Sequence, residues 1–242
     1  MKILQPEDWK SSQKILVILA HPDDPEFFCG GTLARWVDAG HEVSYSLLTK
    51  GDKGLNGWSK VDPKELTRIR EEEQRNAAKV LGVKKVNFLP YKDGYLVADL
   101  TLRKSIVEEI RREKPDILVS CDPMGLYFRE NALNHPDHLA AGKAVVEAAY
   151  PAAGNPLFFP DLIEKNLKPH SVKEIWLSLP ENANVNLDVT GQWEKKIQAL
   201  ACHKSQVGDI DKFKERMKSR RVPGSTEKKP RYLERFRRIC FR

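Results

Sequence analysis

The feature that most constrains the fold is a regular alternation of short apolar runs and amphipathic helical segments over the first 150 residues. The first run, Lys14 to Ala20 (KILVILA), is apolar throughout, which is typical of a strand buried on both faces. The alternation that follows predicts a parallel sheet covered by helices on both faces. We expect strands at 14–20, 42–48, 86–89, 116–120, 172–179 and 185–189, and helices at 30–39, 63–81, 100–113, 135–150 and 191–203.

The 242 residues show no linker and no internal repeat, so we expect a single domain with a core of about residues 14–206. The remaining residues, 207–242, form a basic extension. From His203 onward there are 14 Lys or Arg and 5 Asp or Glu, in a chain whose net charge is +7. The extension carries two apolar triplets at helical spacing, Ile210–Phe213–Met217 and Tyr232–Phe236–Ile239. We therefore predict a C-terminal helical extension whose amphipathic helices dock on the core.

The sequence also bears on the cellular compartment. No apolar run approaches the ~20 residues that a membrane helix needs, and Met1 to Lys14 lacks the apolar centre of a signal peptide. The cysteines have neither metal-site nor disulfide-framework spacing: Cys29, Cys121, Cys202 and Cys240. We expect a cytoplasmic protein with reduced thiols and no membrane partner.

Polar clusters follow two of the expected strands. His21, Asp23 and Asp24 come directly after the first strand, where a dinucleotide-binding fold would carry GxGxxG; its absence argues against a nicotinamide or flavin cofactor. The second cluster, His135-Pro136-Asp137-His138, begins a helix after the fourth strand and its loop. If the strand order reverses at the first strand, the first and fourth strands are neighbours. Their carboxyl ends would then bring the two clusters together.

Such a combination of groups is typical of a catalytic metal site. Two histidines and one carboxylate are a common zinc ligand set that leaves a position for water. The clusters contain more groups than one metal needs, and the surplus groups are candidates for proton transfer and orientation. Each motif alone also has a structural interpretation: HPDD as a turn that caps a helix, and HPDH as a helix start with a surface histidine. Their expected proximity favours the functional interpretation.

At these residues the sequence resembles a known family. AHPDDPEFFCGGT (20–32) and NHPDHLAAG (134–142) are similar to the two signature motifs of the LmbE-like, or PIG-L-type, de-N-acetylases. The resemblance covers most of residues 14–206 and includes four shorter stretches: TKGDKG (49–54), REEEQRNAAKVLGV (70–83), KDG (92–94) and HKSQ (203–206). It implies a Rossmann-like α/β sandwich of three layers with a mostly parallel sheet. It also implies removal of an acetyl group from an N-acetylglucosamine unit.

The resemblance further implies a division of roles between the two clusters. By the family pattern the zinc ligands are His21, Asp24 and His138. Asp23 is then the general base. His135 stabilises the oxyanion, and Asp137 orients it.

Three further positions match residues that contact the sugar in relatives: Arg70, Asp93 and, more weakly, His203. Each of the first two has an alternative interpretation. Arg70 begins a charged run and could form a surface ion pair with Glu71 or Glu73, and Asp93 precedes Gly94 in an ordinary turn pair.

The chain departs from the family pattern at two positions. Many members have Glu directly after HPDD, whereas Pro25 intervenes here and the acid is Glu26. Leu133 stands where some relatives place a tyrosine that assists the oxyanion. Such help must come from elsewhere, for example from Tyr127 or a backbone amide.

The leading hypothesis is a zinc-dependent N-deacetylase that acts on a small N-acetylglucosamine-containing molecule or glycan fragment. A second hypothesis is a zinc amidase that acts on another amide, such as a thiol conjugate. A third, of a different class, is a nucleic-acid-binding protein that uses the basic extension and only a structural metal. The basic residues lie far along the chain from the His/Asp clusters, which argues against nucleic acid as a partner. We expect one divalent metal ion per subunit, a sugar substrate and a homo-oligomer.

Overall fold

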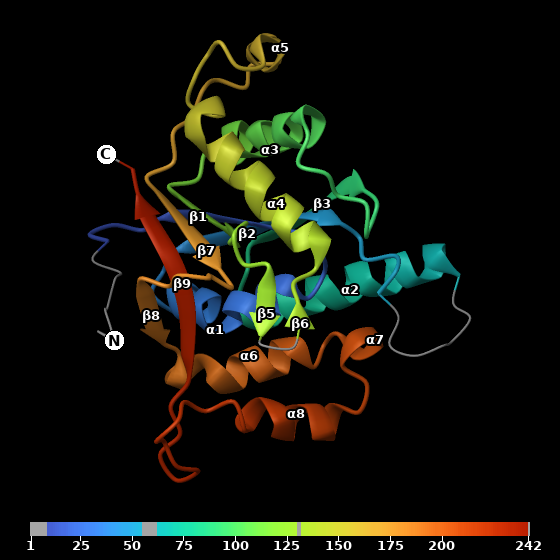
Figure 1. Ribbon diagram of the computed structural model, residues 1–242, viewed down its shortest axis with the longest axis vertical. Coiled ribbons are helices and arrows are strands. Elements are labelled where there is room, and N and C mark those ends of the chain that lie inside the picture. The colour runs from blue at the N-terminus through green and yellow to red at the C-terminus, as the bar shows by residue number, and fades with distance from the viewer. Residues whose placement is uncertain (1–8, 55–61, 130–131, 242) are drawn as a thin grey trace.

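The computed structural model of the protein describes residues 9–54, 62–129 and 132–241. A seven-stranded sheet forms its centre, in the order β3-β2-β1-β4-β7-β9-β8 (Figure 1). Its strands are β1 (Lys14–Leu19), β2 (Glu42–Thr49), β3 (Lys85–Tyr91), β4 (Ile117–Cys121), β7 (Glu174–Ser178), β8 (Val185–Asp188) and β9 (Leu233–Cys240). A separate two-stranded ladder joins β5 (Tyr127–Arg129) to β6 (Ala132–Leu133).

Strand β1 lies between β2 and β4 and pairs with both in parallel. The β2–β3 and β4–β7 pairs are also parallel, whereas β9 runs antiparallel to both of its neighbours. The order therefore reverses at β1, as predicted, and the carboxyl ends of β1 and β4 lie side by side.

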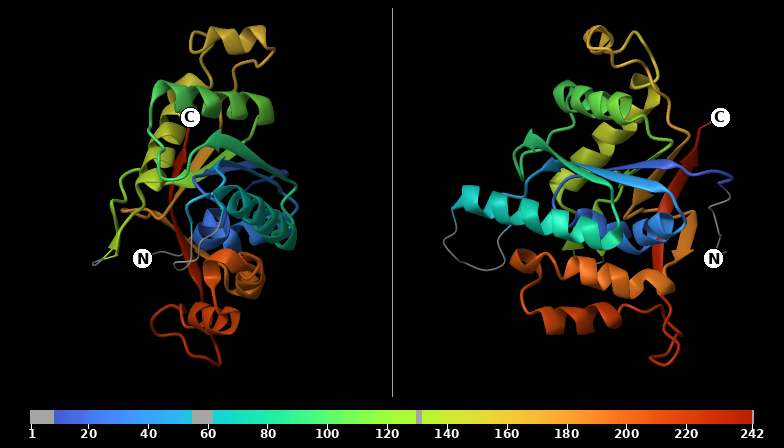
Figure 2. Two further views of the ribbon diagram at one scale, coloured as in Figure 1. Left: turned by 90° about the vertical axis from the view of Figure 1, so that its right-hand side faces the viewer. Right: turned by 180° about the vertical axis from the view of Figure 1, so that it is seen from behind.

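Helices cover both faces of the sheet (Figure 2). One layer contains α1 (Asp24–Asp38), α2 (Pro63–Leu81) and α6 (Trp193–Leu200), with α7 (Lys204–Val207) and α8 (Ile210–Lys218) outside it. The other contains α3 (Leu100–Glu113), α4 (Pro136–Glu147) and a π-helical turn, η1 (Ala148–Ala152). The short helix α5 (Pro160–Glu164) and the 3₁₀ turn η2 (Thr190–Gln192) complete the set. The prediction of a three-layer α/β fold with a mostly parallel sheet is confirmed.

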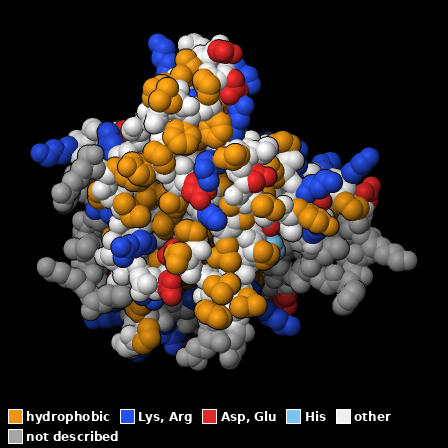
Figure 3. Space-filling view, turned by 45° about the horizontal axis from the view of Figure 1, so that its top comes forward, with side chains coloured by type: hydrophobic (Ala, Val, Ile, Leu, Met, Phe, Trp, Pro, Cys, Tyr) orange, Lys and Arg blue, Asp and Glu red, His pale blue; other side chains and the backbone are white. Residues whose placement is uncertain are grey.

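The surface mixes apolar and charged side chains. On the face drawn in Figure 3, Lys and Arg side chains lie among acidic and apolar ones. Large apolar side chains are exposed on and beside the β5–β6 ladder, including Met124, Tyr127 and Leu133. Among the described residues, no helix combines the length and apolarity that crossing a membrane requires.

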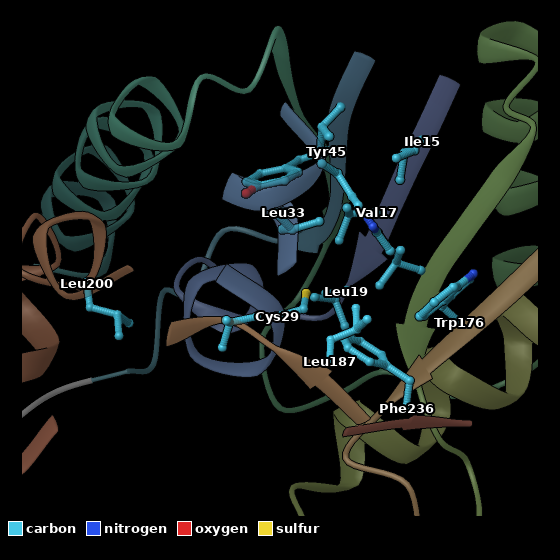
Figure 4. Packing of buried hydrophobic residues seen from close by; sticks show 14 of the residues in the cluster. Ile15, Val17, Leu19, Cys29, Leu33, Tyr45, Trp176, Leu187, Leu200 and Phe236 are labelled. Carbon is cyan, nitrogen blue, oxygen red and sulfur yellow. The ribbon is translucent and has the colours of Figure 1, made fainter. Parts of the chain in front are cut away.

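The core consists of two main apolar clusters, one on each face of the sheet. Because side chains alternate along a strand, β1 supplies both: Val17 packs with Trp36 of α1, and Ile18 packs with Ile106 of α3. All four side chains are fully buried. Figure 4 shows the first of these clusters, with Val17 close to neighbouring strands of the sheet. A strand buried on both faces was predicted for this segment and is confirmed.

Some elements differ from the prediction. Helix α1 begins at Asp24 rather than at residue 30, and it is broken at Cys29, where φ is −144° and ψ is 17°. The predicted start therefore corresponds to the second half of this helix. Helix α6 is shorter than the predicted 191–203. The ladder of β5 and β6 was not predicted.

The basic extension is helical only in part. Helix α8 forms as predicted, and its apolar face docks through Phe213 and Met217, both buried. The second triplet, however, does not form a helix: Tyr232 directly precedes β9, and Phe236 and Ile239 belong to that strand. Spacings of four and three residues fit a helix, but the residues between them alternate. Buried Glu234 and Phe236 are each followed by an exposed arginine, which is the period of a strand.

Candidate active site

The two predicted clusters meet at the carboxyl ends of β1 and β4. His21 follows β1 by two residues, and Asp24 opens α1. His135 caps the N-terminus of α4 by accepting the N–H of Asp137 at Nδ1 (3.2 Å), with Pro136 at the first helical position. The three histidine rings of the site have centroids 4.8–5.3 Å apart. A cavity of about 320 Å³ opens here, lined by both clusters and by Lys53, Arg70, Asp93 and Gln206.

His21 lies among three buried carboxylates. Its Nδ1 is 3.4 Å from Oδ2 of Asp24, and its Nε2 is 3.1 Å from Oδ1 of Asp93 and 3.2 Å from Oδ2 of Asp137. Burial alone would lower the pKa of His21, but the carboxylates, Asp24 above all, outweigh it and raise this pKa to about 12. The three carboxylates therefore favour a positive charge at this point of the cavity, which either a protonated ring or a bound cation beside it would supply.

Asp24 connects His21 to His138. Its Oδ1 is 3.1 Å from Nε2 of His138, while its Oδ2 faces His21. Burial would raise the pKa of Asp24, but the facing histidines hold it well below its usual range. His138 is fixed from the other side: its Nδ1 is 2.9 Å from Oδ1 of Asn134, and the Phe28 ring packs edge-on against it at 5.1 Å.

The donor set fits a divalent metal ion. Ligand atoms about 2.0–2.1 Å from a tetrahedral zinc ion lie about 3.3 Å from one another, and Asp24 lies at comparable distances, 3.1 and 3.4 Å, from His138 and His21. Two sets of side chains bring ligand atoms within 4.8 Å of one another: His21 with His135 and His138, and His21 with Asp93 and Asp137. Asp24 is in neither set, and it faces the two rings through different oxygens. Imidazole and carboxylate donors in a negatively charged pocket suit a divalent cation.

Asp23 occupies an unusual backbone conformation beside Asp24. Its φ of 86° and ψ of −28° lie in the left-handed region, which residues other than glycine rarely adopt. Nη2 of Arg70 lies 3.3 Å from Oδ2 of Asp23. Burial raises the pKa of Asp23 to about 6; Arg70 opposes this rise and Asp24 adds to it. A carboxylate with such a pKa can accept a proton and return it near neutral pH.

The relation between His135 and Asp137 has to be revised. The Asp137 carboxylate faces His21, and it also accepts the N–H groups of Gly94 (2.7 Å) and Leu96 (3.1 Å). It is the backbone N–H of Asp137 that reaches His135, at Nδ1. This hydrogen bond requires a lone pair on Nδ1, so the ring is neutral and carries its proton on Nε2. Burial, together with the facing His21 and His138, likewise lowers the pKa of His135.

Several known proteins resemble this chain in sequence and in fold. Residues 16–149 match the family model described as GlcNAc-PI de-N-acetylase (PIG-L). The diacetylchitobiose deacetylase of Thermococcus kodakarensis is 36% identical over 200 residues, which cover 83% of this chain and 72% of that protein. The chain belongs to the PIG-L family. A solved structure also resembles this chain. The N,N'-diacetylchitobiose deacetylase of Pyrococcus horikoshii superposes on it with a TM-score of 0.85 at 31% identity, covering 97% of this chain and 86% of that one.

The name of a more distant relative gives a different sugar conjugate as its substrate. The 1D-myo-inositol 2-acetamido-2-deoxy-alpha-D-glucopyranoside deacetylase of Rhodococcus erythropolis is 27% identical over 248 aligned residues, which cover 81% of this chain and 82% of that protein.

Within this member of the PIG-L family, two of the three predicted sugar contacts line the cavity. Arg70 is buried rather than paired at the surface: it donates to the carbonyls of Gly51 (2.9 Å) and Pro22 (2.7 Å) in addition to contacting Asp23. Asp93 is also buried, and its contact with His21 holds its pKa at about 2 against the opposing effect of burial.

His203 does not line the cavity. Its side chain is fully buried, with Nε2 3.2 Å from Oε2 of Glu26, so the prediction that it contacts the sugar is wrong for this structure. The cavity is reached instead by Gln206 of the same HKSQ motif, whose side chain donates to the carbonyl of Gly54 at 2.7 Å.

Sequence reasoning did not single out Lys53 and Gln206, which line the cavity, or Gln74, which contacts Asp23. Gln74 is fully buried, and its side-chain oxygen accepts the N–H of Asp23 at 2.8 Å. A signal was present, because Gln74 lies four residues after Arg70 and so on the same face of α2.

Proposed function

We propose that this protein is a metal-dependent hydrolase that removes the acetyl group from an N-acetylglucosamine unit of a small molecule or oligosaccharide. The observation that carries the proposal is the position of Asp23, a partly buried carboxylate with a pKa of about 6, beside the His/Asp cluster in one cavity. The sugar amides named in its relatives support this substrate class. The reaction consumes water and releases acetate and the free amino sugar.

The proposed metal ligands are His21, Asp24 and His138, and the proposed metal is zinc. When bound, zinc supplies Lewis acidity to the amide carbonyl and to the attacking water. Asp137 and Asp93 accept from Nε2 of His21, which leaves Nδ1 on the side of Asp24. A carboxylate behind a ligand histidine fixes its ring and its tautomer.

Asp23 is the proposed general base. It takes a proton from water as the carbon–oxygen bond forms, and it delivers that proton to the amide nitrogen as the carbon–nitrogen bond breaks. Proton transfer of this kind contributes about 10²–10⁴-fold to a rate. The neutral ring of His135 presents its Nε2–H as a donor to the developing oxyanion. Because Nδ1 is already bonded to the start of α4, the direction of this donor is fixed.

For the sugar, we propose contacts from Asp93 and Arg70, with Gln206 and Lys53 at the cavity wall. Asp93 offers acceptors for hydroxyl groups. Arg70 is largely occupied by carbonyls and by Asp23, so its contribution to substrate binding is secondary to its hold on the base.

The central test is the Asp23→Asn variant. We expect wild-type metal content, because Asn leaves all three proposed ligands in place, and a kcat reduced by about 10²–10⁴-fold. Elemental analysis and acetate release from N-acetylglucosamine, its dimer and its conjugates measure these two quantities. Undiminished turnover by this variant would remove Asp23 from the mechanism. Wild-type protein that is metal-loaded but hydrolyses only amides lacking a sugar would contradict the substrate class.

A further inference from the structure

The peptide bond between Pro22 and Asp23 is clamped from both sides by one helix. Arg70 donates to the carbonyl of Pro22 at 2.7 Å, and the side-chain oxygen of Gln74 accepts the N–H of Asp23 at 2.8 Å. Both residues belong to α2, one turn apart. These two bonds fix the peptide plane on one side of the N–Cα bond of Asp23. On the other side, the carbonyl of Asp23 accepts the N–H of Phe27 at 2.9 Å, so rotation about this bond is held at a φ of 86°. A side chain clashes with its own backbone at such a φ, so the conformation persists only if the surroundings impose it.

The orientation of the Gln74 amide is itself determined. Its nitrogen donates to both carboxylate oxygens of Glu26, at 3.1 and 3.0 Å. Because an ionised carboxylate only accepts hydrogen bonds, the amide must turn its nitrogen to Glu26 and therefore its oxygen to Asp23. Gln74 and Glu26 are both fully buried, so water does not compete for these bonds.

Glu26 is fixed in turn by a residue far along the chain. Nε2 of His203 lies 3.2 Å from Oε2 of Glu26, and the His203 side chain is fully buried. The turn that carries His203 is tied to α2 next to Gln74, because Ser205 donates its N–H (2.8 Å) and its hydroxyl (2.6 Å) to the carboxylate of Glu73. A continuous set of buried hydrogen bonds thus runs from the HKSQ motif to the backbone of Asp23.

We propose that Gln74 is a positioning residue for the base, and that Glu26 and His203 serve to orient its amide. This inference rests on the proposed role of Asp23 as the base. Without the Gln74 acceptor, Asp23 relaxes toward a negative φ, and its carboxylate turns away from the reacting amide. The metal ligands, which are held by other contacts, stay in place.

The first test replaces Gln74 with Met, which keeps the length of the side chain and removes both hydrogen bonds. We expect kcat to fall on the order of 100-fold, as for a small misplacement of a catalytic group, with KM and bound metal unchanged. A crystal structure of the variant is expected to show Asp23 outside the left-handed region. Gln198→Met on the exposed face of α6 makes the same chemical change away from the site and serves as the control.

The second test exchanges the side chains at positions 26 and 74. It keeps the inference testable if the Gln74→Met variant fails to fold. In the Glu26→Gln/Gln74→Glu double variant, the carboxylate at position 74 accepts the N–H of Asp23. It also accepts an N–H of the amide at position 26, and the oxygen of that amide accepts a hydrogen bond from His203. A hydrogen bond is therefore kept between each pair of neighbours in the chain: Asp23 with position 74, position 74 with position 26, and position 26 with His203. In Gln74→Glu alone, two carboxylates face each other. We expect low kcat in the single variant and recovery to within about tenfold of wild type in the double variant, as for restored geometry.

Two results would overturn the inference. One is wild-type kcat in Gln74→Met while Asp23→Asn is inactive, because the base would then need no such support. The other is a folded double variant with no more activity than Gln74→Glu. Full activity in Asp23→Asn is a separate outcome: it refutes the base itself, and with it the reason for positioning it.

Discussion

His21 has a contact for each of its ring nitrogens, and this explains much of the local chemistry. Asp24 lies on the Nδ1 side, and Asp93 and Asp137 lie on the Nε2 side. The Asp137 carboxylate is fixed by the N–H groups of Gly94 and Leu96, so it can hold the ring in one orientation. At the proposed metal site, Asp137 would therefore act through His21 rather than through His135.

This arrangement predicts a specific effect for Asp137→Asn. The substitution replaces one carboxylate oxygen with an NH2 group and so removes an acceptor shared by His21 and the backbone. We therefore expect metal affinity to fall by about 10–100-fold. The cap of α4 survives, because it uses the backbone N–H of Asp137. Competition with a chelator of known affinity measures the change.

Two variants calibrate this measurement. His138→Ala, which removes a proposed ligand, should lose the metal altogether. Asp161→Asn makes the matched change at a half-exposed site on α5 and should bind metal like wild type. An Asp137→Asn protein with unchanged affinity would show that Asp137 does not act through a ligand.

At the scale of elements, helix α1 is broken shortly after the turn that carries Asp24. The helix is interrupted at Cys29, which leaves backbone groups on both sides without helical partners. Glu234 of β9 accepts the N–H groups of Gly31 (3.0 Å) and Thr32 (2.7 Å), and Lys196 of α6 donates to the carbonyl of Phe27 (2.8 Å). Lys196 and Glu234 also bond each other at 2.6 Å, and both are buried.

Position 31 of α1 has room only for glycine. A Cβ atom there would lie 2.7 Å from Cβ of Val189 and 3.2 Å from Oε1 of Glu234. The first turn of α1, which carries Asp24, is therefore held against the sheet by groups from the C-terminal part of the chain.

We accordingly predict that Glu234→Ala destabilises the protein by about 3–5 kcal/mol, because it leaves the Lys196 ammonium buried without its partner. Urea unfolding followed by circular dichroism measures the loss. Replacing both residues with Met should cost less than Glu234→Ala, since no charge is then left unpaired. Glu227→Ala, at an exposed position, is the control and should change stability by less than about 0.5 kcal/mol. A Glu234→Ala protein as stable as this control would refute the structural role of the pair.

At the scale of the whole molecule, the sequence was sufficient to predict the parallel strands of the sheet and, given a reversal of strand order at β1, the meeting of the two clusters. The apolar run at 14–20 identified a strand buried on both faces. The alternation of elements predicted a parallel sheet, in which a reversal of strand order at β1 makes β1 and β4 neighbours. Those two inferences place His21 and His138 at one edge, because parallel strands share their carboxyl ends.

The remaining features depend on contacts that a linear pattern does not encode. Tyr232, Phe236 and Ile239 fit a helical spacing, and only the partner strands β7 and β8 decide for a strand. The contact of Glu26 with His203 joins residues 177 apart, so no local period could reveal it. The left-handed conformation of Asp23 likewise follows from hydrogen bonds supplied by α2.

The position of β9 leads to a prediction about the basic extension. This strand lies between β7 and β8, and Phe236, fully buried, packs against Trp176 with ring centroids 5.4 Å apart. Deleting residues 232–242 would open the sheet, remove Glu234 from the α1 break and leave a cavity in the core. Truncating a buried Phe side chain alone costs about 3–5 kcal/mol. Because domains of this size are stable by about 5–15 kcal/mol, we expect the shortened chain to lose its cooperative unfolding transition and its bound metal.

A synthetic peptide with the sequence of residues 232–242, added to the shortened chain, tests whether the missing strand can be replaced. The peptide can pair with the open edges of β7 and β8. The peptide should restore part of the metal binding, and the same peptide with Phe236→Asp should not, because an aspartate cannot occupy the apolar site beside Trp176. Arg237→Ala in the full chain changes an exposed residue of the same strand and should leave unfolding unaltered. If the shortened chain unfolds cooperatively and binds metal as the full chain does, β9 is not part of the folding unit and the core predicted at residues 14–206 is sufficient.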